Sequence, residues 1–239
     1  MELPLIVILG PTASGKTAYA IRLARLIGGE VICADSRTVY RGMDIGTAKP
    51  TEPERAGVLH WGLDLIEPDQ RYSLYDFQRY ATAKIAEIRQ RQHVPLLVGG
   101  SGLYINSVIY DYRLAGGDYD PTARAELEKL SPDELRRLAI KRGAKLPRDL
   151  DNKRRLIRSL ETGGVSNNCG HLSRQTIVIG IAVDKEKLSQ RISERAEQML
   201  ERGLVDETER LIARYGMVEP LRRNAYGVVA KYLTGQIYE

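Results

Sequence analysis

The stretch that most constrains this chain is GPTASGKT at residues 10–17, which fits the phosphate-binding pattern GxxxxGK[ST]. It follows the apolar run Leu5–Leu9 and opens a helical pattern, the strand–loop–helix context that such a loop needs. Backbone N–H groups of this loop type point at phosphate, its lysine reaches the outer phosphates, and its last hydroxyl holds Mg²⁺. The residues are Gly10, Pro11, Thr12, Ala13, Ser14, Gly15, Lys16 and Thr17. The sequence predicts a phosphate-binding protein, with a chance match as the alternative.

The composition indicates a chain that folds without disulfides or structural metals. Its 239 residues, 43% of them hydrophobic and 28% charged, suffice for a large α/β core with a small appended domain. Cys33 and Cys169 lie far apart, and neither has metal-ligand spacing to another cysteine or histidine. There is no basic leader, and no apolar run approaches the roughly 20 residues that span a bilayer. These features predict a cytoplasmic protein without membrane contact.

The apolar pattern predicts an α/β fold with a P-loop kinase-like core, in which helices flank a parallel sheet. The expected strands are residues 5–9, 30–34, 94–98 and 176–183. The expected helices are residues 17–27, 73–92, 185–202, 205–215 and 224–233, and Ser73 is expected to cap the second of them. A polar helical region predicts a small helical inserted subdomain at 116–161, between core segments 1–115 and 162–239.

Polar residues follow two of the expected strands, at the edge where open α/β sheets bind ligands. Asp35 comes just after the second strand, and Ser101 lies in the Gly-rich turn after the third. Asp35 is either a general base beside the phosphates or a carboxylate that orders the loop, and the residues leave both open. Ser101 is either a catalytic hydroxyl or, as capping preference favours, a helix N-cap. His60 and Trp61 are expected either in the core or directly behind the residues that contact a ligand.

Positive charge is concentrated in one region. The net charge is +5, and residues 136–158 hold ten Lys or Arg against two acids. Such a run is either a nucleic-acid contact or a solvated helix face. Arg154 and Arg158 are one helical turn apart, so they share a face that could follow a phosphate backbone.

Other classes of P-loop protein lack their signatures here. Asn152-Lys153-Arg154-Arg155 ends in arginine where a GTPase has the aspartate of NKxD, and there is no DxxG. The strand at 94–98 ends in glycines where a motor ATPase carries an aspartate linked to Mg²⁺. What remains is a kinase-like transferase.

Eight blocks, in order over most of the chain, resemble the tRNA dimethylallyltransferases (tRNA isopentenyltransferases). They are GPTASGKT, ADSRTVYRGMDIGTAKP, HWGLDLIEP, YSLYDFQR, VGGSGLY, DNKRRLIRSLE, RISERAEQMLERGLVDE and RRNAYGVVAKYLTGQI. The resemblance implies transfer of a dimethylallyl group from dimethylallyl diphosphate to N6 of the adenosine 3′ of the anticodon in tRNA. It also implies Mg²⁺ as cofactor, the tRNA anticodon stem-loop as partner, and a monomer.

By matching position, the resemblance implies roles for individual residues. Lys16 and the loop amides would stabilise the leaving diphosphate, Thr17 would hold Mg²⁺, and Asp35 would accept a proton from the adenine amine. Ser101 stands where the family usually has Thr and keeps the hydroxyl. The implied tRNA-binding residues are Asp35, Ser36, Arg37, Thr38, Ser101, Arg124, Arg154, Arg155, Leu156, Ile157 and Arg158.

The sequence departs from the family pattern at several positions. Thr38 replaces Gln, Ala225 replaces Gly, and Asp151-Asn152 reverses the usual Asn-Asp. The chain also ends where bacterial members continue through a further basic helical segment, so we expect a minimal or truncated form, or weakened affinity or activity. The alternatives are a prenyltransferase of free AMP, a P-loop small-molecule kinase, or a tRNA-binding protein without catalysis.

Overall fold

The chain folds into two compact units in a computed structural model that describes residues 2–112, 114, 120–163, 170–172 and 175–237. The larger unit joins Met1–Tyr110 to His171–Glu239, and the smaller one is Asp111–Gly170. The insertion predicted at 116–161 falls inside the smaller unit, and Cys169 lies outside the described residues. No helix in the described part of the chain is long and apolar enough to cross a bilayer.

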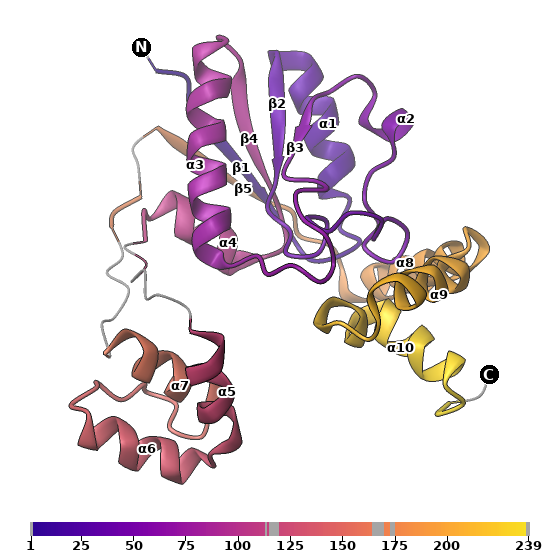
Figure 1. The fold of residues 1–239 in the computed structure, drawn as a ribbon. Helices are drawn as coiled ribbons and strands as arrows, with labels where there is room; N and C mark the ends of the chain where they lie inside the picture. Colours follow the sequence, from indigo (N-terminus) through magenta and orange to yellow (C-terminus); the bar gives the residue numbers. More distant parts are fainter. Residues whose placement is uncertain (1, 113, 115–119, 164–169, 173–174, 238–239) are drawn as a thin grey trace. The chain divides into compact units, whose positions relative to one another are not determined.

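The larger unit is built on a sheet of five parallel strands in the order β3-β2-β4-β1-β5 (Figure 1). The strands are β1 Leu5–Leu9, β2 Gly29–Cys33, β3 His60–Trp61, β4 Val94–Gly99 and β5 Thr176–Gly180. β4 lies between β1 and β2, so the loops after these three strands meet at one edge of the sheet. The predicted α/β class is therefore confirmed.

Both faces of the sheet are covered by helices. The flanking helices are α1 Lys16–Ile27, α3 Leu74–Gln90 and α4 Gly102–Ile109. In β1, Leu5 and Val7 pack in one apolar cluster with Phe77 of α3, whereas Ile6 and Ile8 pack in another with α1. A strand buried on both faces needs apolar residues at consecutive positions, which explains the unbroken apolar run read from the sequence.

Local capping sets the ends of these helices. Ser73 Oγ accepts the N–H of Asp76 at 3.2 Å and Asp76 accepts the N–H of Ser73 at 2.8 Å, a capping box that confirms the predicted cap of α3. α1 instead follows Gly15, whose φ of 85° is left-handed and which provides no side-chain cap. The first N–H groups of α1 therefore stay open to an anion.

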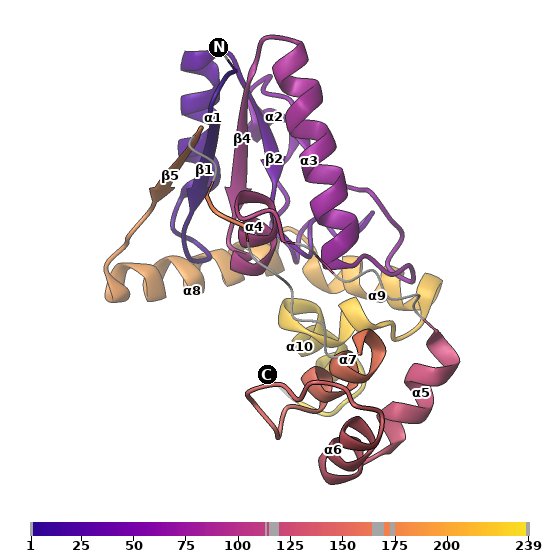
Figure 2. The ribbon, with the colours of Figure 1, turned by 90° about the vertical axis from the view of Figure 1, so that its left-hand side faces the viewer.

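The sheet corrects one bound of the expected strand at 176–183. β5 ends at Gly180 and not at residue 183, and it lies at the edge of the sheet (Figure 2). Ile177 is 51% exposed and Val178 is 44% exposed. An apolar run predicts a strand but does not say which face is covered, because covering helices come from elsewhere in the chain.

The larger unit also contains several short elements and three helices near the C-terminal end of the chain. The sequence did not predict α2 (Glu52–Arg55), β3, α4 or the 3₁₀ helix η1 (Glu219–Arg222). The later helices are α8 Lys185–Glu201, α9 Leu204–Tyr215 and α10 Asn224–Leu233. α9 and α10 share an apolar cluster with Val39 and Met43, which lie in the segment after β2. Residues more than 160 positions apart in the sequence therefore pack in one apolar cluster.

The smaller unit is helical, with its own apolar core. Its helices are α5 Pro121–Lys129, α6 Pro132–Lys141 and α7 Lys153–Thr162. Leu135 of α6 packs with Leu156 and Ile157 of α7. Ser131 caps α6 through a capping box with Glu134.

Candidate functional site

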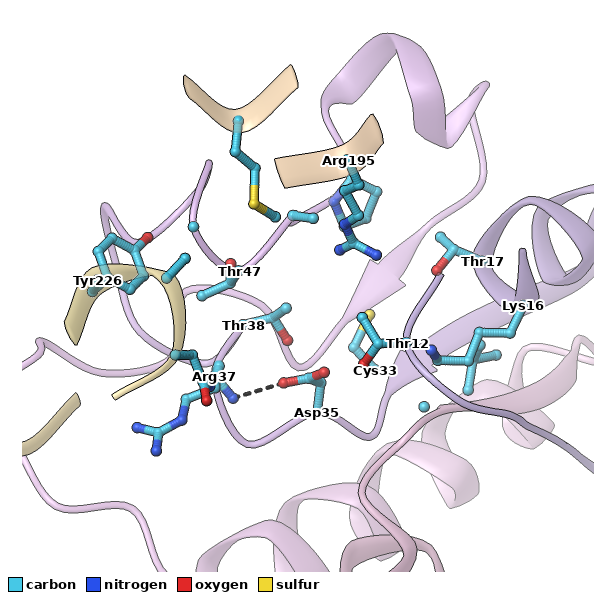
Figure 3. Close-up of a pocket in the computed structure, with 18 of the residues that line it drawn as sticks. Thr12, Lys16, Thr17, Cys33, Asp35, Arg37, Thr38, Thr47, Arg195 and Tyr226 are labelled. Atoms are coloured by element: carbon cyan, nitrogen blue, oxygen red, sulfur yellow. Dashed lines mark hydrogen bonds between the residues drawn. The ribbon is translucent and has the colours of Figure 1, made fainter. Parts of the chain in front are cut away.

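A cavity of about 470 Å³ opens at the carboxyl edge of the sheet, next to the phosphate loop (Figure 3). Its walls come from the phosphate loop, the loop after β2, the segment 46–50, α8 and the start of α10. The charged and polar lining includes Thr12, Lys16, Thr17, Asp35, Arg37, Thr38, Arg195 and Tyr226. Several residues proposed from sequence therefore do meet in one hollow.

The phosphate loop has the curled backbone that its glycines predict. Ala13 and Gly15 have positive φ values of 63° and 85°. Position 10 has no room for a side chain, because a Cβ there would lie 2.8 Å from Ser14 Oγ and 3.0 Å from the carbonyl oxygen of Ile181. Ser14 is buried, and its hydroxyl has no hydrogen-bond partner among the described atoms. The loop thus presents polar atoms at the start of α1, where phosphate binds.

Lys16 and Arg195 bring two cations to the cavity near the carboxylate of Asp35. Lys16 Nζ donates a 3.1 Å hydrogen bond to the carbonyl of Pro11. Burial lowers the pKa of Lys16, Asp35 opposes this shift, and Arg195 adds to it. Burial also lowers the pKa of Arg195, again opposed by Asp35 and by Glu54. Two cations partly withdrawn from water form a strong site for a polyanion such as diphosphate.

Asp35 lies across from the phosphate loop on the loop after β2. Its Oδ1 accepts the backbone N–H of Arg37 at 2.8 Å, so the carboxylate orders its own turn (Figure 3). The backbone N–H of Ser36, which lies between Asp35 and Arg37, donates to Ser101 Oγ at 3.4 Å. Ser101 occupies the N-cap position of α4 but makes no side-chain cap bond. The hydroxyl therefore ties the loop after β4 to the loop that carries Asp35.

Two further polar atoms in the cavity wall have no partner among the described residues. Thr38 is buried and its Oγ1 is unpaired. His60 places one ring nitrogen 2.9 Å from the carbonyl of Val58, while its Nε2 is buried and unpaired. Burial lowers the pKa of His60 and raises the pKa of the neighbouring thiol of Cys33 to about 12. Buried polar groups without partners are costly, so these atoms are candidates for contacts to a ligand.

A second cavity, of about 490 Å³, shares Lys16, Thr17 and Arg195 with the first. It adds Arg191 of α8 and Arg202, which directly follows that helix. The shared cations therefore contact two hollows, which suits a reaction between two substrates.

The oxygen donors in the first cavity fit a divalent cation held mainly by a phosphate ligand. The Thr17 hydroxyl and the Asp35 carboxylate line the same hollow. The described residues contain no group of three or more His, Cys, Asp or Glu side chains that could hold a metal by themselves. Mg²⁺ commonly takes few protein oxygens and completes its shell with phosphate oxygens and water, so this donor set suits it.

The arginine stretch of the smaller unit divides into an exposed and a buried face. Arg154, Arg155 and Arg158 of α7 are exposed. Leu156 and Ile157 are 0% and 1% exposed and pack in the core of the unit. A helix with period 3.6 turns these two side chains inward, so the expected tRNA contact at these positions stays a prediction.

Arg124 is held inside the smaller unit by acids. It donates to Glu128 at 2.9 Å and to Glu161 of α7 at 2.8 Å, and its side chain is 20% exposed. Arg158 lies 3.5 Å from the same Glu161. Arg124 therefore ties α5 to α7, a structural role that the sequence did not indicate.

Sequence reasoning also missed several residues of the first cavity. Arg195 was assigned only to a helix, and Thr47, Ala225 and Tyr226 were given no role. The available signal was an arginine in the middle of a block shared with a known family. Nothing in helical periodicity says that this arginine points at the phosphate loop.

Comparison with known proteins decides the family. The family model described as IPP transferase matches residues 38–239, and the one described as Isopentenyl transferase matches residues 3–63. The chain belongs to the IPP transferase family. The tRNA dimethylallyltransferase of Bacillus velezensis is 40% identical over 98% of this chain and 80% of its own length. That of Streptococcus mutans is 41% identical over 99% of this chain and 82% of its own length.

A solved structure extends this family relationship to the fold. The full-length tRNA isopentenylpyrophosphate transferase of Bacillus halodurans matches with a TM-score of 0.72 and 38% identity, over 98% of this chain and 78% of that one. The match includes the P-loop kinase-like core. This member of the IPP transferase family is accordingly an enzyme of the prenyltransferase type.

Proposed function

We propose that this enzyme transfers a dimethylallyl group from dimethylallyl diphosphate to N6 of the adenosine that follows the anticodon in tRNA. The observation that carries the proposal is the cavity in which Lys16, Arg195 and Asp35 face one another beside the phosphate loop. Lys16 and Arg195 supply positive charge for a leaving diphosphate, and Asp35 supplies a base. The names of the curated relatives support the same reaction.

In this reaction the bond between C1 of the allylic group and the diphosphate oxygen breaks, and the oxygen keeps the electron pair. The N6 lone pair forms the new bond to C1, and N6 gives one proton to Asp35. Negative charge grows on the diphosphate and positive charge on carbon as the transition state forms. Lys16, Arg195 and the open N–H groups of α1 are fixed donors for the growing negative charge, so they favour the transition state over the ground state.

The divalent ion belongs to the same proposal. Mg²⁺ held by Thr17 would supply further charge neutralisation to the diphosphate. Thr17 lines both cavities, so its hydroxyl is placed to share an ion with a ligand at the phosphate loop.

For the acceptor, the adenosine must leave the stacked anticodon loop to reach this cavity. Ser36, Arg37, Thr38 and Ser101 lie around Asp35 and are the proposed contacts for the extruded nucleotide. The exposed Arg154, Arg155 and Arg158 of the smaller unit are the proposed contacts for the RNA backbone. Arg124 contributes by holding α7 in place.

The test is transfer of label from radioactive dimethylallyl diphosphate to either tRNA or free AMP. The proposal expects label in tRNA, lost when the adenosine after the anticodon is replaced by guanosine. Label in AMP alone would move the chain to a free-nucleotide prenyltransferase. Retained tRNA binding without any transfer would identify a binding protein that has lost catalysis.

A further inference from the structure

A buried carboxylate outside the reacting groups holds the loop that closes the cavity. Glu207 of α9 is 4% exposed. Its two oxygens accept the backbone N–H groups of Asp44 at 3.3 Å, Ile45 at 3.0 Å and Gly46 at 3.2 Å. The hydroxyl of Tyr226, on α10, donates to the same carboxylate at 2.5 Å. One side chain thus gathers four donors from two distant parts of the chain.

The loop that Glu207 holds, residues 42–50, supplies part of both cavities. Gly46, Thr47, Ala48 and Pro50 line the first cavity, and Ile45, Ala48, Lys49 and Pro50 line the second. Residues 42–50 form no helix or strand, and the backbone hydrogen bonds within them come from the N–H groups of Ala48 and Lys49. A backbone segment without regular partners keeps a single conformation only if other groups satisfy its N–H groups.

A second anchor fixes the far end of the loop. Lys49 is buried, and its Nζ donates to the carbonyl of Tyr40 at 2.9 Å and to the carboxylates of Asp44 and Asp64 at 2.5 Å and 2.6 Å. Glu207 and Lys49 therefore hold the two sides of Thr47, whose position in the cavity wall lies between them.

The ring of Tyr226 packs tightly against the backbone of Gly46. A Cβ at Gly46 would lie 2.5 Å from the Tyr226 ring and 2.9 Å from a methyl group of Leu204. The ring therefore lies directly on the glycine backbone while its hydroxyl reaches Glu207. Tyr226 itself lines the first cavity, so the packed face and the reaction space share one side chain.

We propose that Glu207 is a positioning residue, which holds residues 44–46 against α9 and α10 and so sets the wall of the prenyl-transfer cavity. This inference rests on the proposed function, because the wall matters only if the cavity holds the substrates. Glu207 itself does not line the first cavity, so its effect on transfer passes through Ile45, Gly46 and Thr47.

The test replaces Glu207 by Gln, which keeps the shape but turns one acceptor oxygen into a donor that faces backbone N–H groups. Glu209→Gln on the same helix is the matched control, since Glu209 is exposed. In full-length protein without substrate, amide hydrogen exchange of residues 44–46 is expected to rise about 10- to 100-fold in Glu207→Gln and to stay unchanged in the control. The exchange arm needs no catalytic turnover.

The kinetic arm measures transfer and tRNA binding separately. We expect Glu207→Gln to lower kcat/KM for dimethylallyl diphosphate at least about 10-fold, while the Kd for tRNA stays within about two-fold, because the tRNA contacts proposed on α7 are untouched. Glu207→Asp keeps the charge with a shorter reach, and partial recovery of both readouts is expected. If Glu207→Gln does not fold, Glu207→Asp is compared directly with wild type.

Unchanged exchange at residues 44–46 would overturn the inference. Faster exchange with wild-type kcat and KM would also overturn it, since Glu207 would then only support the fold. Failure of the proposed function has a different signature: wild-type protein transfers no label to tRNA even though Glu207→Gln still loosens the loop.

Discussion

Oδ1 of Asp35 accepts a 2.8 Å hydrogen bond from the backbone N–H of Arg37, which orients the carboxylate at the cavity by its own turn. Both residues line that cavity, together with Lys16 of the phosphate loop. Asp35 therefore orders its loop and faces the reaction space at the same time. The structure is compatible with Asp35 both as a general base and as the carboxylate that orders its loop. Kinetics can measure how much each role contributes to transfer.

Replacing Asp35 by Asn removes the proposed base but keeps an oxygen that can accept the Arg37 N–H. We expect turnover with tRNA to fall about 10²- to 10⁴-fold while tRNA affinity stays near wild type. Single-turnover transfer and equilibrium binding measure the two quantities, with Asp69→Asn at an exposed position as control. Loss of binding with normal turnover of bound tRNA would assign Asp35 to loop ordering alone.

Arg195→Gln tests the cation that sequence reasoning missed. Removing one charge-assisted contact to diphosphate is expected to lower kcat/KM for dimethylallyl diphosphate about 10- to 100-fold. Lys187→Gln, at an exposed position of the same helix, should leave the rate unchanged. Equal rates for Arg195→Gln and the control would remove Arg195 from the donor site.

Two arginines of the smaller unit should respond differently. Arg158→Ala is expected to weaken tRNA binding and to reduce the slope of log K against log salt by about one, because a phosphate contact is lost. Arg124→Ala breaks the link between α5 and α7, so it should lower the stability of the unit without the change in slope. Binding titrations at several salt concentrations and urea unfolding measure these effects. An unchanged slope for Arg158→Ala would make that side chain part of a solvated face.

Gly99, at the end of β4, lies where no side chain fits. A Cβ there would be 2.0 Å from the carbonyl oxygen of Ala34, so Gly99→Ala must push β2 and β4 apart. We expect the free energy of unfolding to fall by about 1–3 kcal/mol or more. Gly102→Ala is the matched control, because a Cβ at Gly102 meets nothing within 4 Å, and its stability should be equal or slightly higher. Urea unfolding of the two variants gives the comparison.

His60 should make stability depend on pH in a defined direction. Burial lowers its pKa from the usual 6.5, so the folded state binds this proton less tightly than the unfolded state. Below the lowered pKa both states are protonated and the folded state carries the full cost of the buried cation. As pH rises from there to 6.5, this cost disappears and the unfolding free energy rises. Urea unfolding between about pH 5 and pH 8 should show a smaller rise in His60→Asn than in wild type. Equal rises in both proteins would exclude His60 as the source.

Sequence patterns predicted the framework of the larger unit well. The strand at Leu5–Leu9 and the helix Asn224–Leu233 lie where they were expected, and Ser73 caps α3 as predicted. These features depend on neighbours in the chain. By contrast, β3, α2 and α4 were missed, since each is short and held mainly by contacts with distant segments.

The candidate site divides in the same way. The phosphate loop was readable because its chemistry needs glycines, a lysine and a hydroxyl at fixed spacing within eight residues. Arg195, Glu207 and Tyr226 were not, because their roles arise from the packing of α8, α9 and α10 near loops more than 150 residues earlier.

The sequence alone therefore determined what depends on local spacing: the phosphate loop, the parallel α/β core and the helix caps. Only the tertiary structure decided which charges meet. It places Arg195 near Lys16 and Asp35. It buries Leu156 and Ile157 in the core of the smaller unit. It also places Glu207 where its carboxylate accepts the N–H groups of residues 44–46. The physical reason is that backbone propensity acts between near neighbours, whereas burial and electrostatic contact depend on distance in space.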